Sequence, residues 1–315
     1  MKTVFDRLSA FAEVRLNSTY SSEELLPDLR WADAVLMWWV EITEEMLDEC
    51  PNLKFVGKLD VSQTVAKVLL GRNIPVSVSR RGFSPAVAEM ALTLILASLR
   101  RTSNLHSAMW RGDEKWIVNF PGDIDPHERH LTGRKVGIVG FGGIGQRLAQ
   151  LLAPFECEIQ IYDPYLPAEI AKNFNATQTS LETLASSSEI LVICAAANPG
   201  TRSLIDSKLI ESLPTHSIFV NVCRASLVDT QALLTRLQRG DLFAAIDVFD
   251  AEPLALDSPF RSLPNVYLTP HRAGGTIYTA RRILEIVIDD LEAFLKGEPR
   301  KYALTEAMIG SLDSK

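Results

Sequence analysis

The 315-residue sequence has no run of basic residues, and its formal net charge at pH 7 is −7. Nucleic acid binds clustered Lys and Arg side chains, because these neutralise phosphates and release counterions. The sequence offers no such cluster. Nucleic acid is therefore not an expected partner.

Cysteine is scarce, and no C-x-x-C pair is present. Three of the four cysteines lie in apolar, strand-like segments, and the full set is Cys50, Cys157, Cys194 and Cys223. Cysteines in such segments are typically buried and reduced, as in cytoplasmic proteins. We expect neither a disulfide framework nor a metal site.

Long apolar runs are also missing. The longest lies near residues 90–99, which is shorter than the roughly 20 residues that cross a bilayer, and it is typical of a core helix. Lys2 and Asp6 carry charges where the apolar core of a signal peptide would lie. We expect a cytoplasmic protein that does not bind membranes.

Segment 135–149 carries the clearest motif of the chain, G-x-G-x-x-G. Residues 136–139 predict a buried strand, and an apolar helix is expected to begin directly after the glycines. In this motif Gly140 permits a tight turn, Gly142 lets a pyrophosphate approach the backbone, and Gly145 lets the helix pack closely on the strand. Glycine-rich turns also occur without a ligand, so further evidence is needed.

That evidence comes from the next expected strand, residues 158–162, which ends at Asp163. An acidic side chain at about this distance from the glycines typically binds the adenosine ribose hydroxyls. Gly143 and Ile144 would form the first helical turn, whose free N–H groups attract phosphate. The cofactor expected is NAD rather than NADP, because a carboxylate repels a 2′-phosphate.

Strand-like and helix-like segments alternate along most of the chain, which is typical of parallel sheets with crossover helices. The expected strands are 32–39, 53–57, 74–78, 136–139, 158–162, 189–194, 217–222, 243–248 and 266–268. The expected helices are 43–48, 65–70, 86–101, 144–152, 167–173, 180–186, 207–213, 229–239 and 276–297, with Thr43 and Ser84 as N-caps.

Residues 101–132 interrupt this alternation with a polar stretch that contains Trp110, Trp116 and Phe120. A loop of this length is unusual inside a compact domain. We expect it to pack against something, such as a second subunit.

Polar side chains follow three later strands of the expected sheet. Arg224 follows strand 217–222, the carboxylates at Asp247 and Glu252 follow strand 243–248, and His271 follows strand 266–268. Each alone could be a surface cation, a turn residue or a helix cap. Because open α/β sheets place their chemistry at strand ends, the three groups together predict an active site.

The motifs G-F-G-G-I-G, Y-D-P, N-V-C-R-A-S-L-V-D, D-V-F-D-A-E-P-L and L-T-P-H-R-A-G-G-T occur in this order over about residues 85–297. Their order resembles that of the D-isomer-specific 2-hydroxyacid dehydrogenase family. The resemblance implies that Arg224 holds the substrate's carboxylate and carbonyl oxygen, that His271 is the general acid/base, and that Glu252 hydrogen-bonds the imidazole.

The resemblance also implies which residues lie near the nicotinamide. Asp247 would face its carboxamide, and His271 would lie beside it. Val222, Cys223 and Arg224 would pass close to the cofactor.

The implied chemistry agrees with the residue types. Reduction of a 2-oxo acid needs a hydride at carbon and a proton at oxygen. Histidine suits the proton transfer because its ordinary pKa of about 6.5 is near working pH. The planar fork of an arginine can hold two oxygens of an oxo acid. The other histidines, His106, His127, His130 and His216, lack such a setting and are expected to be structural or exposed.

Several positions depart from the family pattern. The glycine usual after the arginine is Ala225, which the backbone is expected to tolerate. The glycine-rich substrate loop is replaced by residues 57–63, so the usual backbone cradle for the substrate carboxylate is altered. Trp38 and Trp39 stand where an arginine is often found, and one of them could wall a pocket for a bulkier substrate. Residues 194–198 also differ, without a clear consequence.

The fold class expected is α/β, with two doubly wound parallel-sheet domains. These are a Rossmann-type NAD-binding domain over residues 102–281 and a flavodoxin-like substrate domain over residues 1–101 and 282–315. The expected protein is an NAD-dependent dehydrogenase, a homodimer by resemblance, that interconverts a small D-2-hydroxy acid and its 2-oxo acid. The alternatives are a catalytically silent NAD(H)-sensing protein and a dehydrogenase of sugar-derived acids.

Overall fold

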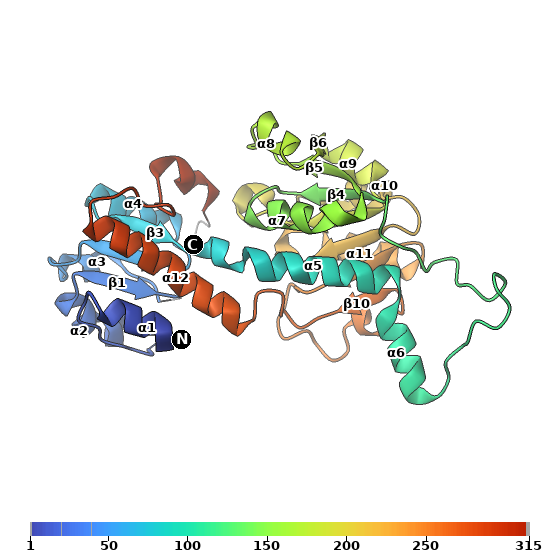
Figure 1. The fold of residues 1–315 in the computed structure, drawn as a ribbon, viewed down its shortest axis with the longest axis horizontal. Helices are drawn as coiled ribbons and strands as arrows, with labels where there is room; N and C mark the ends of the chain where they lie inside the picture. Colours follow the sequence, from blue (N-terminus) through green and yellow to red (C-terminus); the bar gives the residue numbers. More distant parts are fainter. Residues whose placement is uncertain (1, 20, 39, 313–315) are drawn as a thin grey trace. The chain divides into compact units, whose positions relative to one another are not determined.

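A computed structural model describes residues 2–19, 21–38 and 40–312 (Figure 1). The chain forms two compact units. Unit 1 consists of residues 1–83 and 276–315, and unit 2 of residues 84–275. Both ends of the chain therefore belong to one unit, as expected from the sequence.

Unit 1 is built on a parallel sheet in the order β1-β2-β3. Its strands are β1 (Ala34–Met37), β2 (Phe55–Lys58) and β3 (Val76–Val78). Its helices are α1 (Lys2–Ser9), α2 (Ser22–Trp31), α3 (Glu44–Asp48), α4 (Gln63–Gly71), α12 (Ile277–Leu295) and the 3₁₀ helices η1 (Arg80–Phe83) and η6 (Glu306–Ser311). The Thr43 and Ser62 side chains cap α3 and α4 by accepting hydrogen bonds from backbone N–H groups.

The C-terminal segment is bound to the N-terminal strands of unit 1. The Val78 N–H donates a 3.0 Å hydrogen bond to the Tyr302 carbonyl oxygen. The buried Asp290 carboxylate on α12 accepts hydrogen bonds from the N–H groups of Lys301 and Tyr302. Residues far apart in the sequence thus complete one domain.

Unit 2 is built on a seven-stranded parallel sheet in the order β10-β9-β8-β7-β4-β5-β6. Its strands are β4 (Lys135–Val139), β5 (Glu158–Tyr162), β6 (Ala176–Gln178), β7 (Ile190–Ile193), β8 (Ile218–Asn221), β9 (Phe243–Ile246) and β10 (Val266–Leu268). Its longer helices are α5 (Ser84–Leu99), α6 (Thr102–Arg111), α7 (Gly143–Leu152), α8 (Ala168–Lys172), α9 (Leu181–Ser187), α10 (Ser207–Ser212) and α11 (Thr230–Gln238). Short 3₁₀ turns are η2 (Ala153–Phe155), η3 (Pro199–Thr201), η4 (Ala225–Leu227) and η5 (Pro259–Ser262).

Helices cover both faces of this sheet. On one face Val139 and Phe219 pack with the apolar side chains of α9, α10 and α11. Side chains alternate along a strand, so Ile138 and Val220, both fully buried, point to the opposite face. There α5 packs on α7, β8 and β9.

Residues Arg80–Leu99 are long and apolar enough to cross a membrane by length and composition, with a mean hydropathy of 1.6. This stretch is longer than the apolar run recognised in the sequence. Val87, Ala91 and Ile95 of α5 are buried within the protein, which is typical of the core helix expected here.

The strand register brings the carboxyl ends of the central strands to one edge of the sheet. Val139 pairs with both Tyr162 and Ile193, and Asn221 pairs with both Ile193 and Ile246. The chain order reverses between β4 and β7, and open α/β sheets bind ligands at such a switch point.

Two details of the expected organisation differ from the structure. Domain boundaries expected at residues 101/102 and 281/282 fall at 83/84 and 275/276, because the apolar α5 packs against unit 2. Ser84 is the first residue of α5 and not its N-cap, because η1 leads directly into the helix. The expected strands and helices are present with small shifts at their ends, whereas α1, α2, α6 and β6 were not expected from the sequence.

Candidate active site

The turn after β4 has the geometry that a pyrophosphate site requires. Gly140 has φ +86°, and a Cβ atom there would lie 2.5 Å from the Ala195 Cα. A Cβ at Gly145 would lie 2.5 Å from the Gly140 carbonyl oxygen, whereas one at Gly142 would meet no atom within 4 Å. Two glycines are thus required by packing, and the third leaves its backbone open to a ligand.

Helix α7 begins at Gly143, directly after this turn, and Gly142 is its N-cap. Gly143 and Ile144 therefore lie in the first turn, where backbone N–H groups have no partner within the helix. Unpaired N–H groups and the helix dipole favour a phosphate at this position. The residues present fit the dinucleotide expected from the sequence.

Asp163 follows β5 and faces the same turn. One carboxylate oxygen accepts a 2.8 Å hydrogen bond from the Phe141 N–H, and the other accepts a 3.0 Å bond from the Tyr165 N–H. These bonds fix the carboxylate beside the glycine turn. The carboxylate is thus held at the glycine turn, and its bond to the adenosine ribose stays a prediction.

His271 and Glu252 are in direct contact. The His271 Nδ1 lies 2.7 Å from a Glu252 carboxylate oxygen, and both side chains are partly exposed. The other Glu252 oxygen accepts a 3.0 Å bond from the Phe249 N–H. Burial alone would raise the pKa of Glu252. The hydrogen bonds from His271 and Phe249 and the charge of Arg224 together have a larger, opposite effect, so the pKa of Glu252 lies below its ordinary value.

Asp247, the first residue after β9, is fully buried and organises the His271 loop. One carboxylate oxygen accepts bonds from the Thr269 hydroxyl (2.6 Å) and the Arg272 N–H (2.9 Å). The other accepts a 2.9 Å bond from the Ala273 N–H. The carboxylate thus binds the chain on both sides of His271, and contact with the nicotinamide stays a prediction.

Arg224 lies just beyond β8 with an exposed side chain. Its guanidinium donates a 2.7 Å bond to the Cys223 carbonyl oxygen, and it forms no ion pair within the described part of the chain. Asn221 holds this loop, because its side chain donates to the Arg224 carbonyl oxygen (3.0 Å) and accepts from the Cys223 N–H (3.1 Å). The guanidinium is therefore available to an anionic ligand.

Asn221 and Thr269 were not recognised as site residues from the sequence. Each is a short polar residue at the carboxyl end of a strand, which is the signal that could have identified them. Val222 and Cys223 are buried between Asn221 and Arg224. Ala225 opens η4 and has no positive φ, so the alanine is tolerated as expected.

The altered loop of unit 1 has a definite structure. Lys58, at the end of β2, is 2% exposed, and its ammonium lies 3.1 Å from Glu41. Asp60 forms an ion pair with Arg80, and Ser62 caps α4. Trp38 is half-buried. Trp39 lies outside the described residues.

A parallel sheet with a glycine turn at its switch point, an acid after the second strand and a His–Glu pair at the same edge defines an NAD-dependent dehydrogenase. Comparison with known proteins agrees. Residues 92–273 match the model of the D-isomer specific 2-hydroxyacid dehydrogenase, NAD binding domain. The chain belongs to the D-isomer-specific 2-hydroxyacid dehydrogenase family.

Two relatives illustrate the range of this similarity. The chain is 33% identical to a glyoxylate reductase of Thermofilum pendens, over 88% of this chain and 83% of the relative. It is 30% identical to a 2-ketogluconate reductase of Gluconobacter oxydans, over 80% and 79% of the two chains. The fold is similar to that of D-mandelate dehydrogenase from Rhodotorula graminis, with a TM-score of 0.84, 23% identity and coverage of 97% and 94%.

Family membership makes the protein an NAD-dependent oxidoreductase that interconverts 2-hydroxy acids and 2-oxo acids. NAD accepts or donates the hydride when it is bound.

Proposed function

We propose that His271 is the general acid/base of this reaction and that Glu252 orients its ring. The observation that carries this proposal is the 2.7 Å contact between His271 Nδ1 and the Glu252 carboxylate. It engages one ring nitrogen and leaves Nε2 to exchange a proton with the substrate oxygen. The contact with Glu252 fixes the orientation of the ring, which donates the proton during reduction.

Arg224 is proposed to bind the substrate carboxylate. Its guanidinium has no carboxylate partner in the described structure and keeps donors free beyond the one bonded to Cys223. Two parallel N–H donors match the two oxygens of a carboxylate. The substrate is then a small 2-oxo or D-2-hydroxy acid whose reacting oxygen faces His271.

The names of the relatives cover a small oxo acid, a sugar-derived acid and, for the fold, an aryl acid. We propose a D-2-hydroxy acid substrate and leave its side chain to experiment. A sensor that only binds NAD(H) needs none of Arg224, Glu252 and His271, so their joint presence favours the enzyme.

The test is NADH oxidation, followed at 340 nm, with glyoxylate, hydroxypyruvate, 2-ketogluconate and phenylglyoxylate. We expect turnover of at least one class, and a loss of about 10²–10⁴-fold in His271→Ala, because general acid/base catalysis contributes about that much. NADH affinity, measured by fluorescence, should change little. His130→Ala is the matched control, since His130 is exposed and has no proposed part in catalysis or in NADH binding.

Two results would contradict the proposal. Equal turnover in wild type and His271→Ala would mean that another group transfers the proton. Tight NADH binding without turnover of any oxo acid would favour the NAD(H)-sensing alternative.

We also propose that two copies of the chain associate through residues 101–132. Helix α6 has no buried residue, and large apolar side chains there and just beyond it are exposed, including Trp110 (81%), Trp116 (70%) and Phe120 (80%). Monomeric proteins rarely expose so many adjacent apolar groups, which are typical of interfaces.

Sedimentation velocity tests the association. Trp116→Asp combined with Phe120→Asp should convert a dimer to a monomer. Leu256→Asp, at an equally exposed apolar residue elsewhere (91%), should leave the dimer intact. A monomeric wild-type protein would overturn the proposal.

A further inference from the structure

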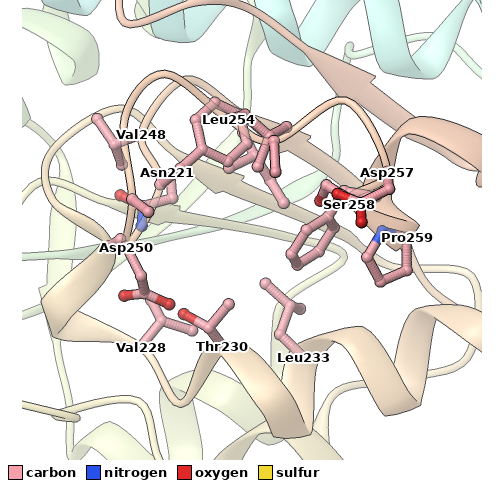
Figure 2. A pocket seen from close by; sticks show the side chains of 16 residues that line it. Asn221, Val228, Thr230, Leu233, Val248, Asp250, Leu254, Asp257, Ser258 and Pro259 are labelled. Atoms are coloured by element: carbon pink, nitrogen blue, oxygen red, sulfur yellow. The ribbon is translucent and has the colours of Figure 1, made fainter.

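A cavity of about 380 Å³ lies in unit 2, on the α11 side of the sheet (Figure 2). Its walls come from the end of β8, from η4, from the first turns of α11 and from the segment after β9. The described residues that line it do not include Arg224, Glu252, His271 or the glycines of the G-x-G-x-x-G motif. It is therefore separate from the proposed sites for the oxo acid and NAD.

The inner wall of the cavity is apolar. Val228, Leu233 and Phe260 contribute to it, with exposed fractions of 5%, 3% and 6%. Figure 2 shows Leu254 across the cavity from Leu233. Small-molecule pockets typically measure about 300–1,000 Å³ and have mostly apolar linings. This one could hold a phenyl ring or a branched alkyl chain.

The polar part of the lining is acidic. Asp250 and Asp257 both line the cavity, and neither carboxylate forms a hydrogen bond or ion pair within the described ranges. Figure 2 shows Thr230 near Asp250 and Ser258 near Asp257. The lining contains no Lys, Arg or His side chain among the residues described. The cavity thus has an apolar wall and acidic groups without a cation.

We propose that this cavity is a second ligand site, which binds a small organic cation with an apolar body, such as an aryl- or branched alkyl-ammonium ion. The ammonium faces the Asp250 carboxylate, where the neighbouring Thr230 hydroxyl can accept one of its N–H bonds, and Asp257 lies at the other end of the cavity, where its charge adds a longer-range attraction (Figure 2). The apolar body packs on Val228, Leu233 and Phe260. The same carboxylates repel the anionic substrates of the proposed reaction.

The position of the cavity couples it to the proposed active site. Asn221 lines the cavity and also holds the backbone of Cys223 and Arg224. Asp250 and Ala251 line it and directly precede Glu252. A ligand therefore contacts the segments that position Arg224 and Glu252, and its binding should change turnover.

Calorimetric titration of the NADH-saturated protein tests the proposal with phenethylammonium and its neutral analogue, phenethyl alcohol. Solvent-exposed ion pairs are each worth about 0.2–1 kcal/mol, so contact with one carboxylate should make the amine bind about 1.4- to 5-fold tighter than the alcohol. Asp250→Asn combined with Asp257→Asn should remove this preference. The control, Asp6→Asn with Glu298→Gln, removes the same charge at two other exposed residues and should keep it.

Equal affinity for the amine and the alcohol in the wild type, or an unchanged preference in the double variant, would overturn the cation site. No detectable binding of the amine would overturn it as well.

Turnover of the oxo acid is measured with and without the amine. Binding that leaves turnover unchanged would overturn the coupling to Arg224 and Glu252. These results do not depend on whether His271 is the acid, because binding is measured without chemistry.

Discussion

The His271 N–H donates a 2.9 Å hydrogen bond to the Asp247 carbonyl oxygen, while the Asp247 carboxylate binds the two residues after His271. His271 has φ +50°, a left-handed conformation that costs about 1–2 kcal/mol for a residue with a Cβ. The bonds to Asp247 offset this cost. The side chain of His271 is thus aimed by a backbone conformation that a buried carboxylate maintains.

Replacement of Asp247 by Ala should therefore affect both stability and activity. It leaves the N–H groups of Arg272 and Ala273 without their partner, and each lost buried partner costs about 1–3 kcal/mol. We expect the free energy of unfolding in urea to fall by about 2–4 kcal/mol and turnover to fall with it. Asp6→Ala, at an exposed carboxylate, should change neither, and a fully stable Asp247→Ala would contradict the argument.

The lowered pKa of Glu252 predicts how the stability of the protein depends on pH. Its pKa in the folded protein is depressed, so its stabilising bond to His271 is fully present above the ordinary carboxylate pKa and is lost as pH falls through the lowered value. Loss of activity between pH 5 and 8 is then not caused by protonation of Glu252. Glu252→Gln has no titrating group at this position, so the stability advantage of the wild type over this variant should be constant above the ordinary carboxylate pKa and should shrink as pH falls through the lowered pKa of Glu252.

Urea unfolding at a series of pH values measures this stability difference, with Glu298→Gln as a control at an exposed glutamate. A stability difference between wild type and Glu252→Gln that does not change with pH would show that the charge of Glu252 does not stabilise the fold.

Two glycines of the G-x-G-x-x-G motif should respond differently to replacement by alanine. A Cβ at Gly145 would lie 2.5 Å from the Gly140 carbonyl oxygen, so Gly145→Ala should lower the melting temperature. A Cβ at Gly142 meets nothing within 4 Å, so Gly142→Ala should keep the melting temperature but weaken NADH binding. Thermal unfolding and NADH fluorescence titration separate the effects. Unchanged NADH affinity in Gly142→Ala would place the pyrophosphate elsewhere.

The thiols near the site should be unreactive. Burial raises the pKa of Cys223 to about 12, against a smaller lowering by Arg224, and burial raises that of Cys194 well above its ordinary value. At pH 8 only about one Cys223 in ten thousand is then a thiolate, the reactive form. A disulfide reagent should label these two only after unfolding in guanidinium. Rapid labelling of Cys223 or Cys194 in the native protein would show that the strand ends open.

Local signals explain what could be predicted from the sequence. The turn at Gly140 and the acid at Asp163 depend on chain geometry within one βα unit, so their spacing is sufficient to predict them. The His271–Glu252 pair joins residues 19 apart, and only the family resemblance identified it. The anchoring bonds of Asp247 depend on the register of β9 and β10, which no local pattern reveals.

The elements missed have equally specific causes. The strand β6 consists of Ala176, Thr177 and Gln178, and its lack of apolar alternation hides it. The helix α6 was interpreted as loop because it buries none of its side chains in this chain. The boundary at Ser84 was missed because α5 is apolar on all sides, so the sequence does not show which domain it packs against.

The pairing of β3 with the C-terminal segment bears on the order in which the protein is made. It consists of the bond between Val78 and Tyr302 and the bridge between Ser77 and Ala303. A ribosome makes β1, β2 and β3 first, yet the segment that pairs with β3 is made more than 200 residues later. The nucleotide-binding unit is contiguous and can fold while the earlier strands still wait for their last partner. The first part of the chain to be made is therefore the last to become a finished domain, and a chain cut short before residue 300 would leave those strands exposed to aggregation.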